Sequence, residues 1–157
     1  MYNIAKSGRN TTTSHHRKGE RTMVKLIVGV RGTGKTKTLI SMVNEAALKS
    51  KGSVICIEKG NKLNYDITHK ARLIDTEAYA VADAQALYGF VAGIAASDHD
   101  ITDLFIDSTL KICQEDMAAF ETFVAEIDAL SEKVGFQVVM TASMPVENCS
   151  EAVRKYI

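Results

Sequence analysis

The feature that most constrains the fold is a glycine-rich turn between an apolar run and a helical pattern. Residues 24–30 (VKLIVGV) form a continuous, β-branched run, which is typical of a strand covered on both faces. Residues 35–49 have the period of a helix, and its apolar face carries Leu39, Ile40, Val43 and Ala47. The turn between them, Gly29–Thr36 (GVRGTGKT), matches G-x-x-x-x-G-K-[ST] at every fixed position. This order of strand, turn and helix predicts an α/β fold.

The residue types of the turn predict a binding site for a chain of phosphates. Glycines let the backbone bend so that successive N–H groups face an anion, and the helix that begins near Lys35 adds its positive amino end. Lys35 supplies a charge for the β- and γ-phosphates, and Thr36 supplies a hydroxyl ligand for Mg²⁺. Arg31, at a variable position, either touches phosphate or stands in solvent. We expect a nucleoside triphosphate to contact Gly29, Arg31, Gly32, Thr33, Gly34, Lys35, Thr36 and Lys37.

Apolar runs and helical periods alternate along the rest of the chain. The patterns predict strands at residues 24–30, 53–58, 71–75, 101–107 and 136–143. They predict helices at residues 35–49, 76–97, 112–135 and 146–157, with Gly135 as a helix C-cap. Strands that alternate with helices form a parallel sheet with helices on both faces. We therefore expect a three-layer α/β/α domain with a mostly parallel, five-stranded sheet.

Charge divides the chain into two parts. Residues 1–22 are polar and carry five basic side chains against one acidic side chain, so we expect a disordered basic tail and a working protein that begins near Met23. Residues 23–157, the expected P-loop domain, carry fourteen basic and eighteen acidic side chains. This mildly acidic balance gives no net-charge argument for nucleic acid binding.

The cysteines and the hydropathy predict a cytoplasmic protein without a membrane partner. Cys56, Cys113 and Cys149 are an odd number and lack metal-ligand spacing, which favours a reduced compartment. The longest apolar patch, residues 86–96 (ALYGFVAGIAA), is about half of the ~20 residues that a membrane-spanning helix needs.

A second acidic element follows the loop in the sequence. Leu104–Asp107 (LFID) is an apolar strand that ends in an acid, the pattern of a Walker B element. An aspartate in this place can hold Mg²⁺ beside a phosphate loop, although many buried strands also end in a structural carboxylate. Ser108 and Thr109 follow, so no glutamate stands beside the acid, and a catalytic base must come from elsewhere.

Glu58 is the best candidate for that base. It closes residues 53–58 (SVICIE), and ligands gather at the carboxyl ends of parallel strands. The alternative is a salt-bridged or solvated acid at the end of a strand. Thr141 and Ser143 end the last strand, where they either sense the γ-phosphate and orient water or have no chemical role.

In this order, these elements resemble the RecA/KaiC-like P-loop ATPases over roughly residues 23–145. The resemblance implies that Glu58 activates water, that Asp107 holds magnesium, and that Thr141 or Ser143 is the polar residue of the later strand. It also implies that the 136–141 strand lies between the strand that precedes the Gly29–Thr36 loop and the strand that ends at Asp107. The chain stops soon after the 136–141 strand, whereas that family continues with strands that carry DNA-binding loops and inter-subunit fingers. Strand exchange and a motor cycle are therefore not expected.

Three functions remain open from the sequence. The leading hypothesis is an ATP-binding protein with weak Mg²⁺-dependent ATP hydrolysis, with Lys35 and Glu58 as catalytic residues, which acts as a switch or as an accessory to a protein partner or in a homo-oligomer. The alternatives are a small-molecule kinase and a nucleotide-binding module that does not hydrolyse. A kinase typically places its magnesium-aspartate strand directly beside the phosphate-loop strand. ATP is favoured over GTP because no N/T-K-x-D motif is present. The basic side chains considered for charge compensation are Arg31, Arg72, Arg154 and Lys155.

Overall fold

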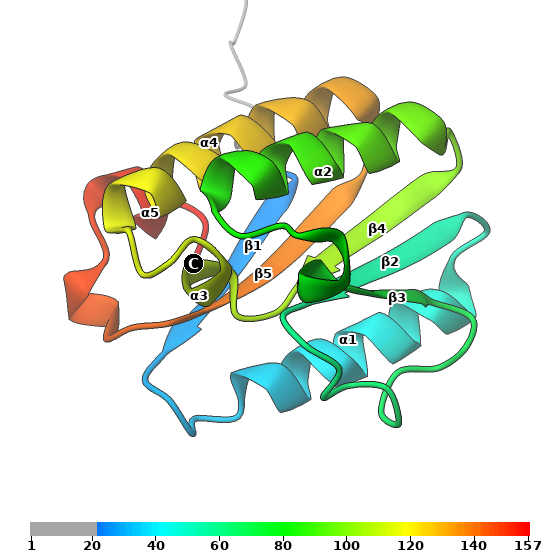
Figure 1. Cartoon of the computed structure of the whole chain (residues 1–157), viewed down its shortest axis with the longest axis horizontal. Helices are drawn as coiled ribbons and strands as arrows, with labels where there is room; N and C mark the ends of the chain where they lie inside the picture. Colours follow the sequence, from blue (N-terminus) through cyan, green and yellow to red (C-terminus); the bar gives the residue numbers. More distant parts are fainter. Residues whose placement is uncertain (1–21) are drawn as a thin grey trace, which may run out of the picture.

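A parallel sheet of five strands forms the centre of the domain, as a computed structural model of residues 22–157 shows (Figure 1). The strands are β1 (Val24–Gly29), β2 (Ser53–Glu58), β3 (Arg72–Asp75), β4 (Ile101–Ile106) and β5 (Gln137–Ser143). The α-helices are α1 (Lys35–Lys49), α2 (Ala84–Ser97), α3 (Thr109–Ile112), α4 (Met117–Val134) and α5 (Glu151–Arg154). Two short 3₁₀ helices complete the list, η1 (Thr76–Tyr79) and η2 (Val146–Asn148). The disordered tail expected for residues 1–22 lies outside the described residues, except for Thr22.

The order of the strands confirms the predicted fold class. The sheet runs β1-β5-β4-β2-β3, and all neighbouring strands are parallel. Strand β5 therefore separates β1, which leads into the Gly29–Thr36 loop, from β4, which leads into Asp107. Because all strands run the same way, their carboxyl ends meet at one edge of the sheet, where α/β proteins place their ligands.

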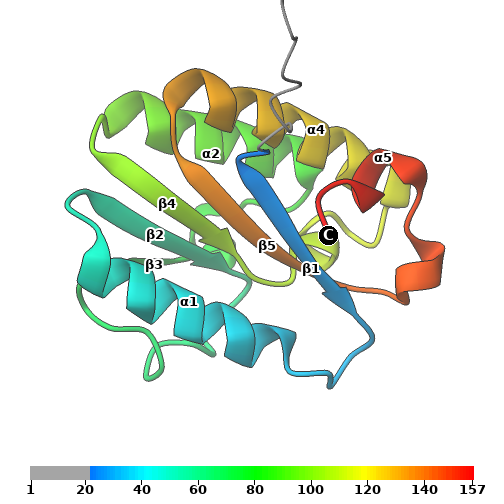
Figure 2. The ribbon, with the colours of Figure 1, turned by 180° about the vertical axis from the view of Figure 1, so that it is seen from behind.

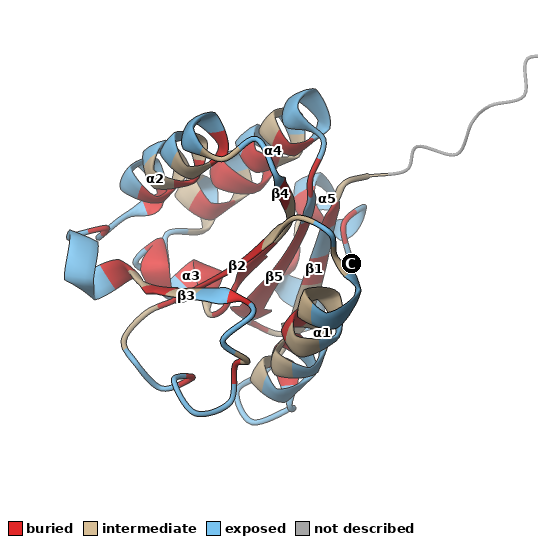
Figure 3. Cartoon of the chain, turned by 90° about the vertical axis from the view of Figure 1, so that its right-hand side faces the viewer, coloured by how far each residue is buried: buried red, intermediate tan, exposed pale blue. Residues whose placement is uncertain are grey.

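The two faces of the sheet are covered unequally. Helices α2 and α4 lie side by side on one face, and α1 lies on the other (Figures 1 and 2). The larger apolar core lies between the sheet and helices α2 and α4, and it includes Leu104 of β4 and Phe120 and Phe123 of α4. A smaller core under α1 includes Leu39 and Val43. Figure 3 shows that the strands are mostly buried and that the helices bury only their inner faces. This is the pattern expected of a sheet between two helical layers.

Two predicted helices begin later in the structure than in the sequence analysis. The helix expected from residue 76 begins at Ala84, because Asp83 accepts a hydrogen bond from the Ala86 N–H and caps it. The helix expected at 112–135 begins at Met117, where Asp116 accepts from the Ala119 N–H. Its end was predicted correctly, since Gly135 is the C-cap with φ of 97°.

The closing helix is also shorter than expected. Residues 146–157 contain η2 and the four residues of α5 rather than one helix. The end of this segment lies along the outer edge of β1, where the Leu26 N–H donates to the Tyr156 carbonyl oxygen over 2.7 Å (Figure 2). An exposed strand edge is thereby covered in part by the chain itself.

No helix within residues 22–157 is both long enough and apolar enough to cross a bilayer.

Gly52 offers a test of the packing between the strands. A Cβ at Gly52 would lie 2.0 Å from the Asp100 carbonyl oxygen and 2.7 Å from Thr102 Cγ2. We expect Gly52→Ala to lower the free energy of unfolding by about 3 kcal/mol, at the upper end of overpacking costs, because backbone must move. Gly89 lies within α2, and a Cβ there meets nothing within 4 Å. Gly89→Ala is the control and should stabilise by about 0.5–1 kcal/mol. Urea denaturation measures both, and equal values would contradict the packing described.

Candidate functional site

The alternation of side chains places four polar residues on the face of the sheet that α1 covers. The core under α1 contains Val54 and Cys56 of β2, Phe105 of β4 and Val139 of β5. Because the side-chain period of a strand is two, the next positions on that face are Glu58, Asp107, Thr141 and Ser143. These positions stand at the carboxyl ends of neighbouring strands, beside the first turn of α1.

Asp107 is the centre of a hydrogen-bond network that joins three segments of the chain. Thr36 Oγ1, in the first turn of α1, donates to the carboxylate, 3.1 Å from Oδ1 and 3.2 Å from Oδ2. Thr141 Oγ1 at the end of β5 donates to Oδ1 over 2.7 Å, and Ser108 Oγ lies 3.3 Å from Oδ2. Two residues that the sequence predicted to be metal ligands, Thr36 and Asp107, are therefore in direct contact.

Ser108 has a strained backbone next to this network. Its φ of 55° lies in the left-handed region, which is rare for a residue with a side chain. The conformation directs its N–H to Thr141 Oγ1 at a distance of 2.8 Å. The Asp107 N–H donates in turn to the Ile57 carbonyl oxygen over 2.9 Å. Asp107 is thus held through its backbone by β2 and through its carboxylate by Thr36, Thr141 and Ser108.

The Gly29–Thr36 loop has the backbone that its glycines predict. Gly32 and Gly34 both have φ of 84°, which side-chain-bearing residues adopt only with strain. Gly34 is the N-cap of α1, and no side chain caps that end of the helix. The Lys35 ammonium group donates to the Val30 carbonyl oxygen over 2.8 Å and lies 3.4 Å from Thr33 Oγ1. Lys35 is therefore folded back over the loop itself.

Glu58 ends β2 and is almost completely buried, with 3% of its surface exposed. Its carboxylate accepts the Leu63 N–H, at 3.1 Å from Oε1 and 3.3 Å from Oε2. Burial raises the pKa of Glu58, and the negative charges of Asp107 and Asp75 raise it further, while the backbone N–H groups of Leu63 and Lys62 act against them. Glu58 is therefore not solvated, and it forms no ion pair with a lysine of residues 22–157.

A cavity of about 740 Å³ opens at this edge of the sheet. Thr36, Thr141 and Ser143 line it together with the Gly29–Thr36 loop, and its size is within the range of small-molecule sites. Its acidic lining residues are Asp66 and Glu115. Its basic lining residues are Arg31, Lys35, Lys37, Lys62 and Lys111. The excess of positive charge suits an anionic ligand.

The sequence analysis missed two of these basic residues. Lys62 stands in the connection between β2 and β3, and Lys111 stands in α3, four residues after Asp107. Their sequence neighbourhoods contain no motif, but both follow strands that end in an acid. Of the residues considered for charge compensation, Arg154 donates to the Cys149 carbonyl oxygen and Lys155 lies over the Tyr156 ring, both in the C-terminal segment.

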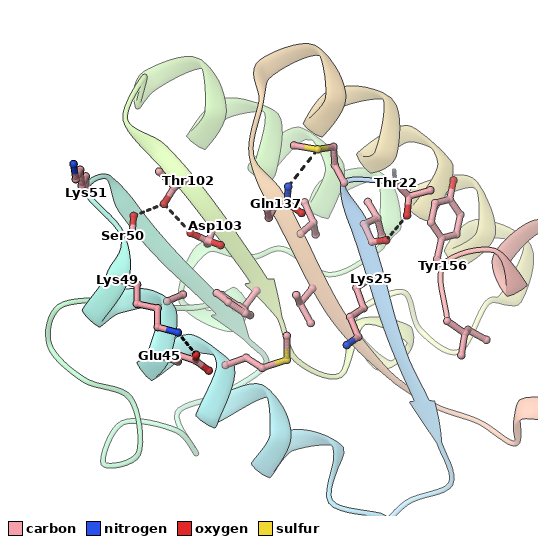
Figure 4. A pocket seen from close by; sticks show the side chains of 18 of the residues that line it. Thr22, Lys25, Glu45, Lys49, Ser50, Lys51, Thr102, Asp103, Gln137 and Tyr156 are labelled. Carbon is pink, nitrogen blue, oxygen red and sulfur yellow. Dashed lines mark hydrogen bonds and ion pairs between the residues drawn. The ribbon is translucent and has the colours of Figure 1, made fainter. Parts of the chain in front are cut away.

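A second cavity, of about 780 Å³, lies at the other edge of the sheet (Figure 4). It is formed by the amino-terminal halves of β1, β5 and β4 and by the end of α1, and Lys25, Asp103 and Gln137 stand on its walls. Lys49 and Glu45 pair beside it. Although it is slightly larger, it lies at the amino ends of the strands, away from the glycine loop and the Asp107 network. We therefore place the candidate site in the first cavity.

The oxygen ligands at Asp107 fit a small, hard cation. A carboxylate and a hydroxyl stand together, and proteins bind Mg²⁺ through one or two carboxylates together with the phosphates of a substrate. Within residues 22–157 there is no cluster of three or more His, Cys, Asp or Glu side chains that could hold a metal ion.

Comparison of the chain with protein-family models and with curated proteins gave no match.

Thr141 offers a test of the network. Its hydroxyl is buried, donates to Asp107 and accepts from the Ser108 N–H. We expect Thr141→Val, which keeps the shape, to lower the free energy of unfolding by about 1–3 kcal/mol, because both partners lose their hydrogen bonds. Thr141→Ser keeps the hydroxyl and is the control. If urea denaturation shows valine to be no worse than serine, the hydroxyl does not hold the network together.

Proposed function

We propose that the chain is a nucleoside triphosphate-binding protein of the RecA/KaiC-like P-loop type, with slow Mg²⁺-dependent hydrolysis of ATP. The observation that carries the proposal is the contact between Thr36 and Asp107, which lie 71 residues apart in sequence. A hydroxyl after the loop lysine and a strand-end carboxylate are the two protein ligands that a phosphate-bound magnesium ion needs. The glycine loop and the uncapped amino end of α1 supply backbone donors for the phosphates.

The order of the strands favours this proposal over the kinase alternative. Strand β5 stands between β1 and β4, whereas a small-molecule kinase typically has the phosphate-loop strand and the magnesium-aspartate strand as neighbours. The hydroxyl at the end of β5, Thr141, then reaches Asp107 from the intervening strand. This contact supports Thr141 as the polar residue expected at the end of the later strand.

The place of Glu58 supports hydrolysis over a passive binding module. Its carboxylate lies on the same face of the sheet as Asp107, next to the connection that carries Leu63 to the cavity. A raised pKa brings a carboxylate closer to the range in which general bases work best. The carboxylate also accepts the Leu63 N–H, and this hydrogen bond competes with the binding of an attacking water. Such competition is consistent with slow turnover.

In this proposal the protein acts in the cytoplasm as a switch or as an accessory, with a protein partner or a second copy of itself. Slow hydrolysis keeps the protein in its ATP-bound state long enough for such a partner to bind it. ATP is the proposed nucleotide and Mg²⁺ the proposed ion.

The first experiment replaces the loop lysine. We expect Lys35→Ala to abolish binding of Mg²⁺-ATP in calorimetry, because the lysine of this motif supplies the positive charge for the β- and γ-phosphates. Lys133→Ala, in the exposed last turn of α4, is the control. Both variants should keep the circular dichroism of the wild type. Equal ATP affinity in wild type and Lys35→Ala would remove the proposal.

The second experiment separates hydrolysis from binding. Glu58→Gln should keep the ATP affinity within a few-fold and lower the hydrolysis rate by ~10²–10⁴, the usual contribution of a general base. Asp107→Asn should instead weaken the Mg²⁺ dependence of ATP binding. Steady-state phosphate release and calorimetry measure the two effects. An unchanged rate in Glu58→Gln would leave the non-hydrolysing module as the better function.

A further inference from the structure

The cavity carries more positive charge than the Gly29–Thr36 motif explains. Lys62 and Lys111 line it from outside the loop, and both side chains belong to exposed residues. They come from two different connections, one after β2 and one after β4. Asp66 and Glu115 stand on the same walls and offset part of this charge.

Lys62 is held in place through its backbone by Glu58. The carboxylate accepts the Leu63 N–H at 3.1 Å and 3.3 Å, and the Lys62 N–H also interacts favourably with it. The connection is fixed further along as well, where the Asn44 amide of α1 donates to the Asp66 carbonyl oxygen over 2.8 Å. The buried Glu58 carboxylate therefore fixes the position of the Lys62 backbone.

Lys111 is held in place by a strained segment. Four non-glycine residues within residues 22–157 have positive φ, and three of them (Ser108, Gln114 and Glu115) stand immediately before or after α3. The Gln114 amide donates to the Ala82 carbonyl oxygen over 2.6 Å and ties this segment to the start of α2. Strain of this kind persists only where the surrounding structure imposes it, and it concentrates at functional sites. Here it brings α3 across the carboxyl end of β5, beside the cavity (Figure 1).

We infer that Lys62 and Lys111 bind the terminal phosphate of the triphosphate, so that this one chain supplies the charge compensation that the loop lysine leaves incomplete. The inference rests on the proposed function, because it assigns further contacts in the same cavity. Phosphoryl transfer needs positive charge on the oxygens of the transferring group, and a cation can come from the same chain or from a partner. In this chain the cations come from the same chain, and Lys62 and Lys111 together distinguish a triphosphate from a diphosphate.

The experiment compares ATP with ADP, both with Mg²⁺, in calorimetry on the full chain. Lys62→Ala and Lys111→Ala should each weaken ATP binding about tenfold, the value of one hydrogen bond to a charged group, and leave ADP binding within about twofold. The double variant should lose the preference for ATP. Lys70→Ala is the matched control, since this exposed lysine lies in the same connection as Lys62 but outside the cavity lining.

Glu58 provides a second readout. Glu58→Ala removes the acceptor that holds the connection, so it should reduce the preference for ATP over ADP as Lys62→Ala does, whereas Glu58→Gln keeps an acceptor oxygen and should retain the preference. A parallel measurement with tripolyphosphate and pyrophosphate, which lack the base, should show the same pattern.

The outcomes separate this inference from the proposed function. If the wild type binds ATP and both lysine variants keep its preference for ATP over ADP, the inference is wrong and the proposed function stands. If ATP and ADP weaken equally in both variants, the lysines contribute general charge only, and the inference is also wrong. If the wild type binds neither nucleotide, both proposals fall together.

Discussion

The hydrogen bonds to the Asp107 carboxylate are the interaction on which the rest of the site depends. The carboxylate lies buried at the end of β4 and accepts from Thr36 of α1 and from Thr141 of β5. A buried charge is costly unless hydrogen bonds satisfy it, so the first turn of α1, the end of β5 and the turn after β4 are held at fixed positions around it. The end of the Gly29–Thr36 loop is thereby held by Asp107 through the Thr36 hydroxyl. One carboxylate thus fixes the start of α1 relative to the sheet and also marks the place of the proposed magnesium ion.

The parallel register extends this arrangement to the remaining acid. Glu58 pairs in register with Asp75 at the ends of β2 and β3. Glu58 accepts the Leu63 N–H of the connection between these strands, and Asp75 accepts the Gly60 N–H of the same connection and the Glu77 N–H of η1. The acids at the ends of these strands therefore have two effects. They hold the neighbouring loops by hydrogen bonds, and they bring negative charge near the site. The raised pKa of Glu58 results mainly from burial and to a smaller extent from the negative charges of Asp107 and Asp75. Folded Glu58 therefore binds its proton more tightly than unfolded Glu58, so its contribution to stability is largest below the ordinary glutamate pKa of about 4.3 and falls as pH rises through the raised pKa.

The sequence predicted the elements that follow from local chemistry and missed those that depend on irregular turns. Apolar runs, helical periods and the fixed positions of Gly29–Thr36 are sufficient to predict the strands, the layers and the approach of Thr36 and Asp107 at one edge. They left open whether Thr141 or Ser143 is the polar residue of the last strand. The order of the strands came from the resemblance, since periodicity does not determine which strands are neighbours. The late start of α4 was missed because Gln114 and Glu115 have left-handed backbone without being glycine or asparagine. The roles of Lys62 and Lys111 in lining the cavity were missed for a related reason. Tertiary contacts, and no sequence motif, place the segments after β2 and β4 beside the cavity.

Helix α2 has a property that its place in the larger core explains. Its sequence, AQALYGFVAGIAAS, contains no charged side chain and two glycines. It therefore has no ion pairs along its surface, and each glycine costs about 1 kcal/mol of helix propensity relative to alanine. Such a segment has little tendency to form a helix alone, so its order comes from the burial of Leu87 and Val91 against the sheet and α4. The order of α2 in the folded domain consequently depends on its docking against the sheet and α4 more than on its local helix preference.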